Sequence, residues 1–178
     1  MPQTEDVGVL VDPHVRYHVS WLESVAEFDG AHMDGAGMAT PDLAALADPA
    51  RFAALVADLN AARRPEYPRP PDRVPATSLW IVDGESHVGF LQIRHTLNDF
   101  LLNEGGHIGY SVRPSARRRG HARAALRDAL PVARSLGIDR VLVTCDETNA
   151  ASRATIEGNG GVYEDSRGGK RRYWIATN

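Results

Sequence analysis

The sequence predicts an α/β domain in which helices flank a central sheet, and two patterns carry this prediction. The first is a hairpin, because SLWIV and HVGFLQIRH flank the tight-turn sequence DGES at residues 83–86. The second is a βαβ unit, in which the strand HIGYSV, an arginine-rich turn, an amphipathic helix and the strand RVLVTC follow one another. The 178 residues, 43% of them hydrophobic, suit a single domain over residues 1–178 that buries most of its apolar side chains.

The first part of the chain predicts one strand, then helices and a loop. VGVLVDP has the pattern of a strand, and Ser20 with Glu23 forms a capping box that predicts the start of a helix. Thr40-Pro41 and Asp48-Pro49 predict two further helix starts, because each places a capping side chain before a proline suited to the first turn. The five prolines of residues 63–77 then predict a surface loop, since each removes an amide donor.

The second half of the chain predicts a long helix, a strand, a short helix and a terminal hairpin. Apolar residues recur at helical spacing beyond Gly120, and Gly137 provides the stop. Pro131 interrupts this helix and removes a hydrogen bond at a cost of ~3 kcal/mol, which packing must offset. After RVLVTC, we expect a helix over residues 150–157 and two strands, GVYED and RRYWIA, joined across Gly168-Gly169.

Composition excludes several classes of protein. A formal net charge of -3 provides no overall field that attracts nucleic acid, so an anion site must be a local patch. The single cysteine excludes an internal disulfide, and the apolar runs are far shorter than the ~20 residues that cross a bilayer as a helix. Since the first residues also lack a signal-peptide pattern, we expect a cytoplasmic protein without nucleic-acid or membrane partners. The oligomeric state stays open, with a homodimer among the alternatives.

The turn RRRGHA, between the strand HIGYSV and the long helix, has the chemistry of a phosphate site. The first amides of a helix point outward, and small residues such as Gly120 and Ala122 let a diphosphate approach the backbone. Arg117, Arg118 and Arg119 place cations at the positive end of the helix dipole, which costs ~0.3–1 kcal/mol each unless an anion binds or they turn away. The alternative is a solvated basic helix start. Neither a P-loop nor a Gly-x-Gly-x-x-Gly pattern is present.

This turn resembles the Arg/Gln-x-x-Gly-x-Gly/Ala signature of the GNAT acetyltransferases, whose loop grips the pyrophosphate of acetyl-CoA. IRHTLNDFL, GGHIGYSVRP and NAASRATIEGNGG are similar to a bacterial subgroup of predicted acetyltransferases in this superfamily. The resemblance covers residues 78–178, the core cofactor-binding part. It implies the GNAT fold, a mixed, mostly antiparallel central sheet with splayed central strands, where the pantetheine arm enters from one side and the amine from the other.

The resemblance also implies which residues bind acetyl-CoA, the co-substrate. The backbone of Ser111 and Val112 would pair with the pantetheine amides like an added strand, and Asn149 and Ser152 would contact the cofactor arm. The other implied contacts form the phosphate loop: Arg117, Arg118, Arg119, Gly120, His121 and Ala122. Asn149 equally fits a cap for the next helix.

Direct transfer in this family needs a base for the attacking amine and allows an acid for the leaving thiolate. Ile156 stands where many relatives have a tyrosine as the acid. The acid here is therefore Tyr163 or a water, or else the thiolate, with a reference pKa of ~8.5, leaves without assistance. Glu104 is one candidate base, since some relatives have a glutamate there, and His107 is another because of its reference pKa of ~6.5. The alternative for Glu104 is a solvated loop carboxylate, and the alternative for His107 is a hydrogen-bonded strand residue.

The acceptor is predicted to be a small-molecule amine or a protein terminus. His95 and Asn98 are candidates for its cleft, although both could instead cap local backbone. Cys145 lacks a His/Asp partner pattern and is expected to be a buried, apolar residue rather than an acyl nucleophile. No metal site is predicted. The alternative function is a non-catalytic acyl-CoA-binding domain that has lost transfer.

Overall fold

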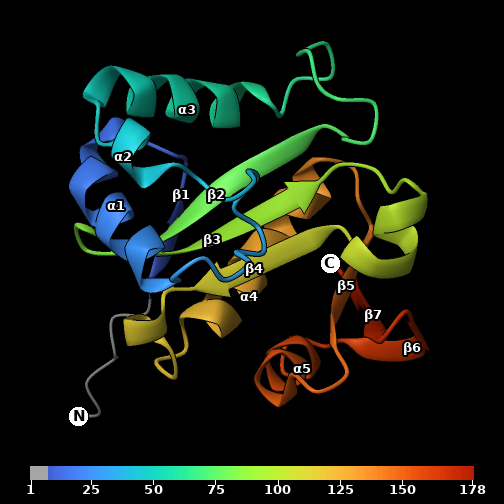
Figure 1. The fold of residues 1–178 in the computed structure, drawn as a ribbon. Helices are drawn as coiled ribbons and strands as arrows, with labels where there is room; N and C mark the ends of the chain where they lie inside the picture. Colours follow the sequence, from blue (N-terminus) through green and yellow to red (C-terminus); the bar gives the residue numbers. More distant parts are fainter. Residues whose placement is uncertain (1–7) are drawn as a thin grey trace.

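A seven-stranded sheet forms the centre of the protein (Figure 1). The fold is described from a computed structural model over residues 8–178, so Val7 of the predicted first strand lies outside the described residues. Every neighbouring pair of strands is antiparallel except β4 and β5. The strands, in their order across the sheet, are β1 (Val9–Val11), β2 (Ala76–Asp83), β3 (Ser86–Arg94), β4 (Ile108–Val112), β5 (Arg140–Asp146), β7 (Lys170–Ala176) and β6 (Val162–Arg167).

The predicted hairpin is confirmed and is buried on both faces. Gly84 adopts a φ of 58° in the turn between β2 and β3, as a tight turn requires. On β2, Leu79 and Ile81 pack into a cluster that includes the helix α4 (His121–Ser135). Trp80 and Val82 pack on the other face, in an aromatic cluster with the N-terminal helices. SLWIV therefore reads as a continuous apolar run because neither face meets water.

The N-terminal helices cover one face of the sheet, and two of their predicted starts need correction. They are the 3-10 turn η1 (Val15–Tyr17), α1 (His18–Glu27), α2 (Leu43–Leu46) and α3 (Pro49–Ala61). Ser20 lies inside α1, because η1 leads directly into the helix, and its hydroxyl accepts from the buried His87 amide at 2.8 Å. Asp42 rather than Thr40 caps α2, whereas the predicted cap at Asp48 and the proline after it are confirmed.

The opposite face carries α4 (His121–Ser135) and α5 (Ala150–Glu157), as predicted. Pro131 is accommodated inside α4, whose apolar side packs against the sheet through residues such as Leu126 and Ala129. Gly137 follows the helix with a φ of 83°, the left-handed conformation of a helix stop. The terminal hairpin of β6 and β7 is confirmed. Within residues 8–178, no helix is both long and apolar enough to span a bilayer.

The two central strands splay apart, which confirms the predicted sheet. The parallel strands β4 and β5 share one register pair, Ile108 with Val143, and then diverge (Figure 1). Next to this pair, His107 donates its amide to the Leu142 carbonyl at 2.7 Å, and its ring Nδ1 accepts from the Leu142 amide at 2.9 Å. Gly106, with a φ of 68°, lies so close to Leu142 that a Cβ would be 2.6 Å from the Leu142 oxygen.

Candidate active site

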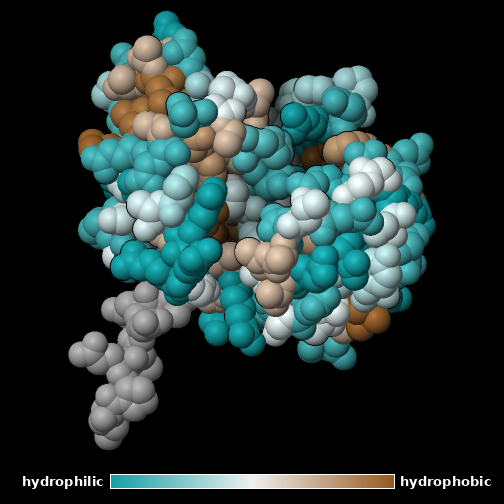
Figure 2. Space-filling view, turned by 60° about the horizontal axis from the view of Figure 1, so that its bottom comes forward, coloured by the Kyte–Doolittle hydropathy of each residue, from teal (hydrophilic) through white to brown (hydrophobic). Residues whose placement is uncertain are grey.

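A large cavity of about 1290 Å³ runs from the start of α4, past the splay, to the proline-rich loop. It is lined at one end by the turn before α4 and at the other by loop residues such as Tyr67, Arg69 and Arg73. In the space-filling view, the surface is hollowed, with a mainly hydrophilic rim and hydrophobic residues visible at depth (Figure 2). The cavity therefore extends to both sides of the splay.

The turn predicted to be the phosphate loop forms the first end of the cavity. Gly120 is the N-terminal cap residue of α4 with a φ of 82°, and a Cβ there would meet nothing within 4 Å. Arg118 also has a positive φ of 62°, and both residues line the cavity together with Ala122. The backbone thus turns sharply into the helix and leaves the first amides of α4 accessible to an anion.

The other loop residues differ in their surroundings. Arg117 lines the cavity, and its Nε donates to the Val112 carbonyl at 3.0 Å, so part of its guanidinium supports the end of β4. His121 also lines the cavity, but the residue is buried and its Nδ1 accepts from the Gly8 amide at 3.0 Å. Arg119 is exposed and does not line the cavity.

The splay forms the middle of the cavity. Ser111 and Val112 line it from β4, which has no ladder pair with β5 after Ile108. Asn149 and Ser152 line it from the start of α5. Asn149 also caps α5, because its Oδ1 accepts from the Ser152 amide at 3.0 Å, so the capping alternative is confirmed.

Tyr110 is a site residue that sequence reasoning missed. It is half-buried on β4, lines the cavity, and shares a hydrogen bond of 2.7 Å between its hydroxyl and that of Ser152. Burial raises the pKa of Tyr110 to about 12, so the phenol stays protonated at neutral pH. Alternation along HIGYSV could have indicated its direction, but its meeting with α5 depends on the tertiary structure.

Tyr163 lies elsewhere. Its side chain is exposed on β6 and does not line the cavity; its hydroxyl bonds to that of Ser166 at 3.1 Å. The Arg171 guanidinium carbon lies 4.2 Å from the centre of its ring. The role of Tyr163 as the thiolate acid therefore stays a prediction without support from its position. Ile156 belongs to α5 and is fully buried in the core.

Glu104 lies in a π-helical turn, η2 (Leu101–Gly105), within the stretch that the sequence left irregular. It is half-buried and lines the cavity, and its backbone carbonyl accepts from the Thr144 hydroxyl of β5 at 2.5 Å. Its carboxylate forms no ion pair within residues 8–178. Glu104 is therefore held beside the splay by its backbone, which leaves its carboxylate without an ion-pair partner among the described residues.

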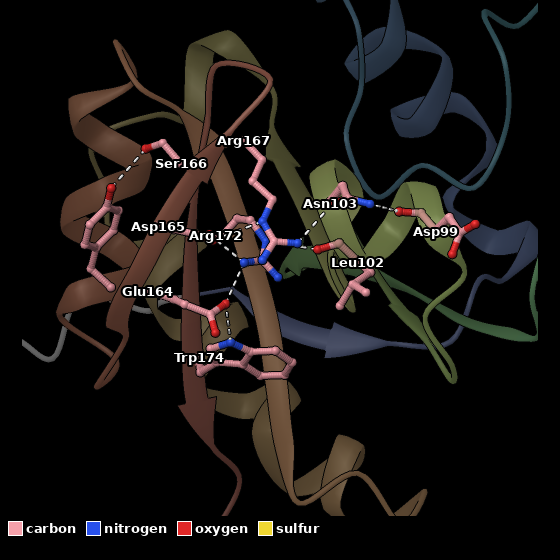
Figure 3. A network of polar contacts seen from close by, with 10 residues as sticks. Asp99, Leu102, Asn103, Glu164, Asp165, Ser166, Arg167, Arg172 and Trp174 are labelled. Atoms are coloured by element: carbon pink, nitrogen blue, oxygen red, sulfur yellow. Dashed lines mark hydrogen bonds and ion pairs between the residues drawn. The ribbon is translucent and has the colours of Figure 1, made fainter.

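A buried arginine of β7 supports this turn (Figure 3). Arg172, whose side chain is 1% exposed, donates from Nε to the Leu102 carbonyl at 2.9 Å and from Nη1 to Glu164 and Asp165. Arg167 adds a bond of 2.9 Å from its Nη1 to the Asn103 side chain. The terminal hairpin is thereby joined to η2 at two consecutive residues.

Three other predicted residues, His95, His107 and Asn98, do not line the cavity. His107 is buried between β4 and β5, and burial, with the nearby Arg94 charge, lowers its pKa to about 4. His95 bonds through Nε2 to the Thr77 hydroxyl at 2.8 Å, and burial lowers its pKa. Asn98 accepts from the Leu101 amide at 2.9 Å, so it caps local backbone at η2, which was its alternative role.

Cys145 is the buried residue that the sequence predicts, but it also lines the cavity from β5. Burial raises the pKa of its thiol, which keeps it protonated and weakly nucleophilic. Among the described residues, no group of three or more His, Cys, Asp or Glu side chains could hold a metal ion.

Comparisons with known proteins agree with this geometry. RimJ of Mycobacterium smegmatis in complex with CoA-disulfide has a TM-score of 0.69 and 20% identity over 97% of this chain and 83% of that chain. The microcin C7 self-immunity acetyltransferase MccE, in complex with acetyl-CoA and AMP, has a TM-score of 0.63 and 14% identity over 96% and 93%. An acetyltransferase of Salmonella typhimurium that modifies the N-terminal serine of ribosomal protein L7/L12 has a TM-score of 0.60 and 16% identity over 94% and 93%.

At these identities, the solved structures show a shared fold. No curated protein matches the chain. The family model of the acetyltransferase (GNAT) domain, however, matches residues 39–162, which is more than half of the chain and includes β2 to α5. The chain therefore belongs to the GNAT acetyltransferase family, whose reaction is the transfer of an acetyl group from acetyl-CoA.

Proposed function

We propose that this protein transfers the acetyl group of acetyl-CoA directly to a primary amine, without an acetyl-enzyme intermediate. The observation that carries the proposal is the cavity that joins the start of α4 to the splay and continues to the proline-rich loop. We call its end at α4 the first entrance, which would take the cofactor arm, and its end at the proline-rich loop the second entrance, which would take the acceptor. The mixed sheet, the predicted phosphate loop and the splay between β4 and β5 all belong to one GNAT domain.

The residues at the first entrance suit acetyl-CoA. Its pyrophosphate would lie against the first amides of α4, where Gly120 has no Cβ and Arg118 adds positive charge. The pantetheine arm would follow the backbone of Ser111 and Val112, which lacks a strand partner on the β5 side. The thioester would then lie in the splay, near Tyr110 and Ser152.

Glu104 is the base that the geometry favours. It lines the cavity next to the splay, so it can accept the proton of the amine directly or through a water molecule. His107 is a weaker candidate, because its Nδ1 already accepts an amide hydrogen and its lowered pKa of about 4 makes it a poor base at neutral pH. As the amine nitrogen bonds to the carbonyl carbon, the C–S bond breaks and the electron pair stays on sulfur.

Tyr110 is the acid that we assign to the departing thiolate. Its phenol is protonated at neutral pH and lies in the cavity, bonded to the Ser152 hydroxyl. The phenol proton moves to sulfur, and the phenolate regains a proton from solvent through Ser152. The thiolate can also leave with little help, since its reference pKa is ~8.5.

The acceptor and cellular setting are proposals of the same kind. A small-molecule amine and a protein terminus both suit the second entrance, and the Salmonella neighbour modifies the N-terminal serine of L7/L12. The polar lining of that entrance, with Arg69, Asp72 and Arg73, favours a charged acceptor over an apolar one. We place the reaction in the cytoplasm.

The test is the release of free thiol from acetyl-CoA with a panel of amines. Glu104→Gln should lower kcat by about 10²-fold or more while CoA affinity, measured by calorimetry, changes little. Glu147→Gln is a matched control, because Glu147 is exposed and does not line the cavity. An unaltered kcat in Glu104→Gln would reject Glu104 as the base. CoA binding without thiol release from any amine would favour the non-catalytic acyl-CoA-binding domain.

A further inference from the structure

Arg94 is a cation of the cavity without an anionic partner. It is half-buried at the end of β3, where its Nε donates to the Gln92 side chain at 3.2 Å and its Nη1 to the Gly105 carbonyl at 3.1 Å. No carboxylate of residues 8–178 lies within 4.0 Å of its guanidinium, and Nη2 donates to none of these residues. Nε and Nη1 are thus engaged with neutral groups, and Nη2 is unused.

The position of this guanidinium is set by the splay. Both terminal nitrogens lie against Gly109 of β4, where a Cβ would be 3.0 Å from each of them. The glycine lets the guanidinium lie flat on the strand, one residue before Tyr110. Its bond to the Gly105 carbonyl places it against the backbone of the π-helical turn that carries Glu104. Because side chains alternate along a strand, the guanidinium lies on the face of β4 opposite the Tyr110 side chain.

The charges around Arg94 do not compensate it fully. Burial lowers the pKa of Arg94, and the nearby positive charge of Arg73 lowers it as well. The negative charge of Asp34 raises this pKa, but Asp34 does not form an ion pair with Arg94. Arg73 also lines the cavity and has no ion pair among the described residues. A buried cation is costly unless an anion or several dipoles surround it. Here the cavity leaves room for an anion from outside the chain.

We infer that Arg94 binds a carboxylate of the acceptor, so that the acceptor is an amine with a carboxylate close to its amino group. The unused Nη2 and the positive charge of the guanidinium offer a carboxylate a charge-assisted hydrogen bond. Because the turn that carries Glu104 contacts Arg94, the site would hold the acceptor carboxylate at Arg94 and let its amino nitrogen reach toward the proposed base. This inference rests on the proposed function and narrows its substrate class.

The carboxylate has two sources, and matched substrates distinguish them. Free amino acids, compared with their C-terminal amides, test recognition of the α-carboxylate. Peptides that begin with Asp or Glu, compared with those that begin with Asn or Gln, test a side-chain carboxylate. We expect one acid series to exceed its amide series by about tenfold or more in kcat/KM, because the amide loses a charge-assisted hydrogen-bonded pair.

The variants are Arg94→Met, Arg94→Lys and Arg172→Met. Arg94→Met should reduce the acid-to-amide ratio to about one, and Arg94→Lys should restore part of it, because a lysine keeps the charge without the fork. Arg172→Met is the structural control: it disturbs η2 through Leu102 but removes no cavity cation, so it should slow acids and amides alike. A lower acid-to-amide ratio of kcat/KM therefore indicates loss of carboxylate recognition, whereas an equal decrease of kcat/KM for acids and amides indicates a structural disturbance.

A binding measurement separates this inference from the proposed function. With CoA present, N-acetyl-L-amino acids and N-acetylated acidic peptides should raise the melting temperature of the parent more than their amides do, and Arg94→Met should remove this difference. Equal effects of acids and amides on the parent would overturn the inference, as would an unchanged preference in Arg94→Met. Thiol release with neutral amines but not with carboxylates would overturn it while the acetyltransferase function stands. Absence of CoA binding would reject the proposed function itself.

Discussion

The Nε atom of Arg172 donates to the carbonyl oxygen of Leu102 at 2.9 Å, across a separation of 70 residues. This bond joins the last strand of the chain to the π-helical turn that carries Glu104. The same guanidinium bonds to Glu164 and Asp165, whose carboxylates are partly exposed. The terminal hairpin thus contributes to the proposed active site although none of these acidic side chains lines the cavity.

Arg172→Met should lower both stability and activity, because it leaves the Leu102 carbonyl and two carboxylates without their buried donor. We expect a lower urea midpoint and a reduced kcat with nearly unchanged CoA affinity. Arg167→Met is the matched control, since Arg167 belongs to the same network but its side chain is 40% exposed. Equal midpoints for the parent and Arg172→Met would contradict the supporting role of this network.

Gly120→Ala should weaken CoA binding by about tenfold, or about 1.4 kcal/mol, because the left-handed turn aims the first amides of α4 at the pyrophosphate. Gly137→Ala is a close control: its φ of 83° matches the 82° of Gly120, and neither Cβ would meet an atom within 4 Å. Both variants should lose about 1–3 kcal/mol of stability through backbone strain. Calorimetry with CoA that showed the same affinity in both variants would reject the phosphate loop.

Tyr110→Phe should reduce single-turnover acetyl transfer by about tenfold, less than the ~10²–10⁴-fold of a strongly required acid, because a thiolate leaves readily. Tyr163→Phe should leave the rate unchanged, since Tyr163 is exposed and lies outside the cavity lining. The reverse result, a loss only in Tyr163→Phe, would identify Tyr163 as the acid and exclude Tyr110.

The stability of the protein should fall as the pH decreases below about 6.5, partly through His87. Burial and the Arg113 charge lower the pKa of His87 to about 3, and neither ring nitrogen has a hydrogen-bond partner among the described residues. Between pH 6.5 and about 3, His87 is protonated in the unfolded chain but neutral in the native state. The free energy of unfolding therefore falls by about 1.4 kcal/mol for each pH unit of acidification in this range.

His87→Phe should make the dependence of the unfolding free energy on pH shallower between about 6.5 and 3. The variant keeps an aromatic ring against Trp80 and Phe90, which pack around His87. Because His107 and Glu27 also have lowered pKa values, the informative quantity is the difference in slope between the parent and the variant. Parallel curves from urea titrations would show that His87 contributes no acid sensitivity.

Cys145→Ala should retain acetyl transfer, because a buried thiol with a raised pKa is a poor nucleophile. Intact-protein mass spectrometry should detect no acetyl adduct on the parent after incubation with acetyl-CoA. An adduct on Cys145 that an added amine then consumes would replace direct transfer with a ping-pong route.

Short-range signals explain how much of this protein could be predicted from its sequence. The hairpin at residues 83–86, the cap at Asp48 and the turn at Gly120 each depend on neighbours within a few residues, so the sequence alone determines them. Where two local signals compete, as Thr40 and Asp42 do for the start of α2, sequence spacing does not decide between them.

Long-range contacts decided the rest. Tyr110 meets Ser152 from 42 residues away, and Arg94 lies flat on Gly109 because β3 and β4 pair in one register and β5 then diverges. Tyr163 lies outside the cavity lining because β6 forms the edge of the sheet, two strands from the splay. Strand register and burial select the face on which a side chain lies, and both arise only when distant segments pack together. The sequence therefore determined the family and predicted the phosphate loop, whereas the tertiary structure decided which proton donors and cations share the cavity.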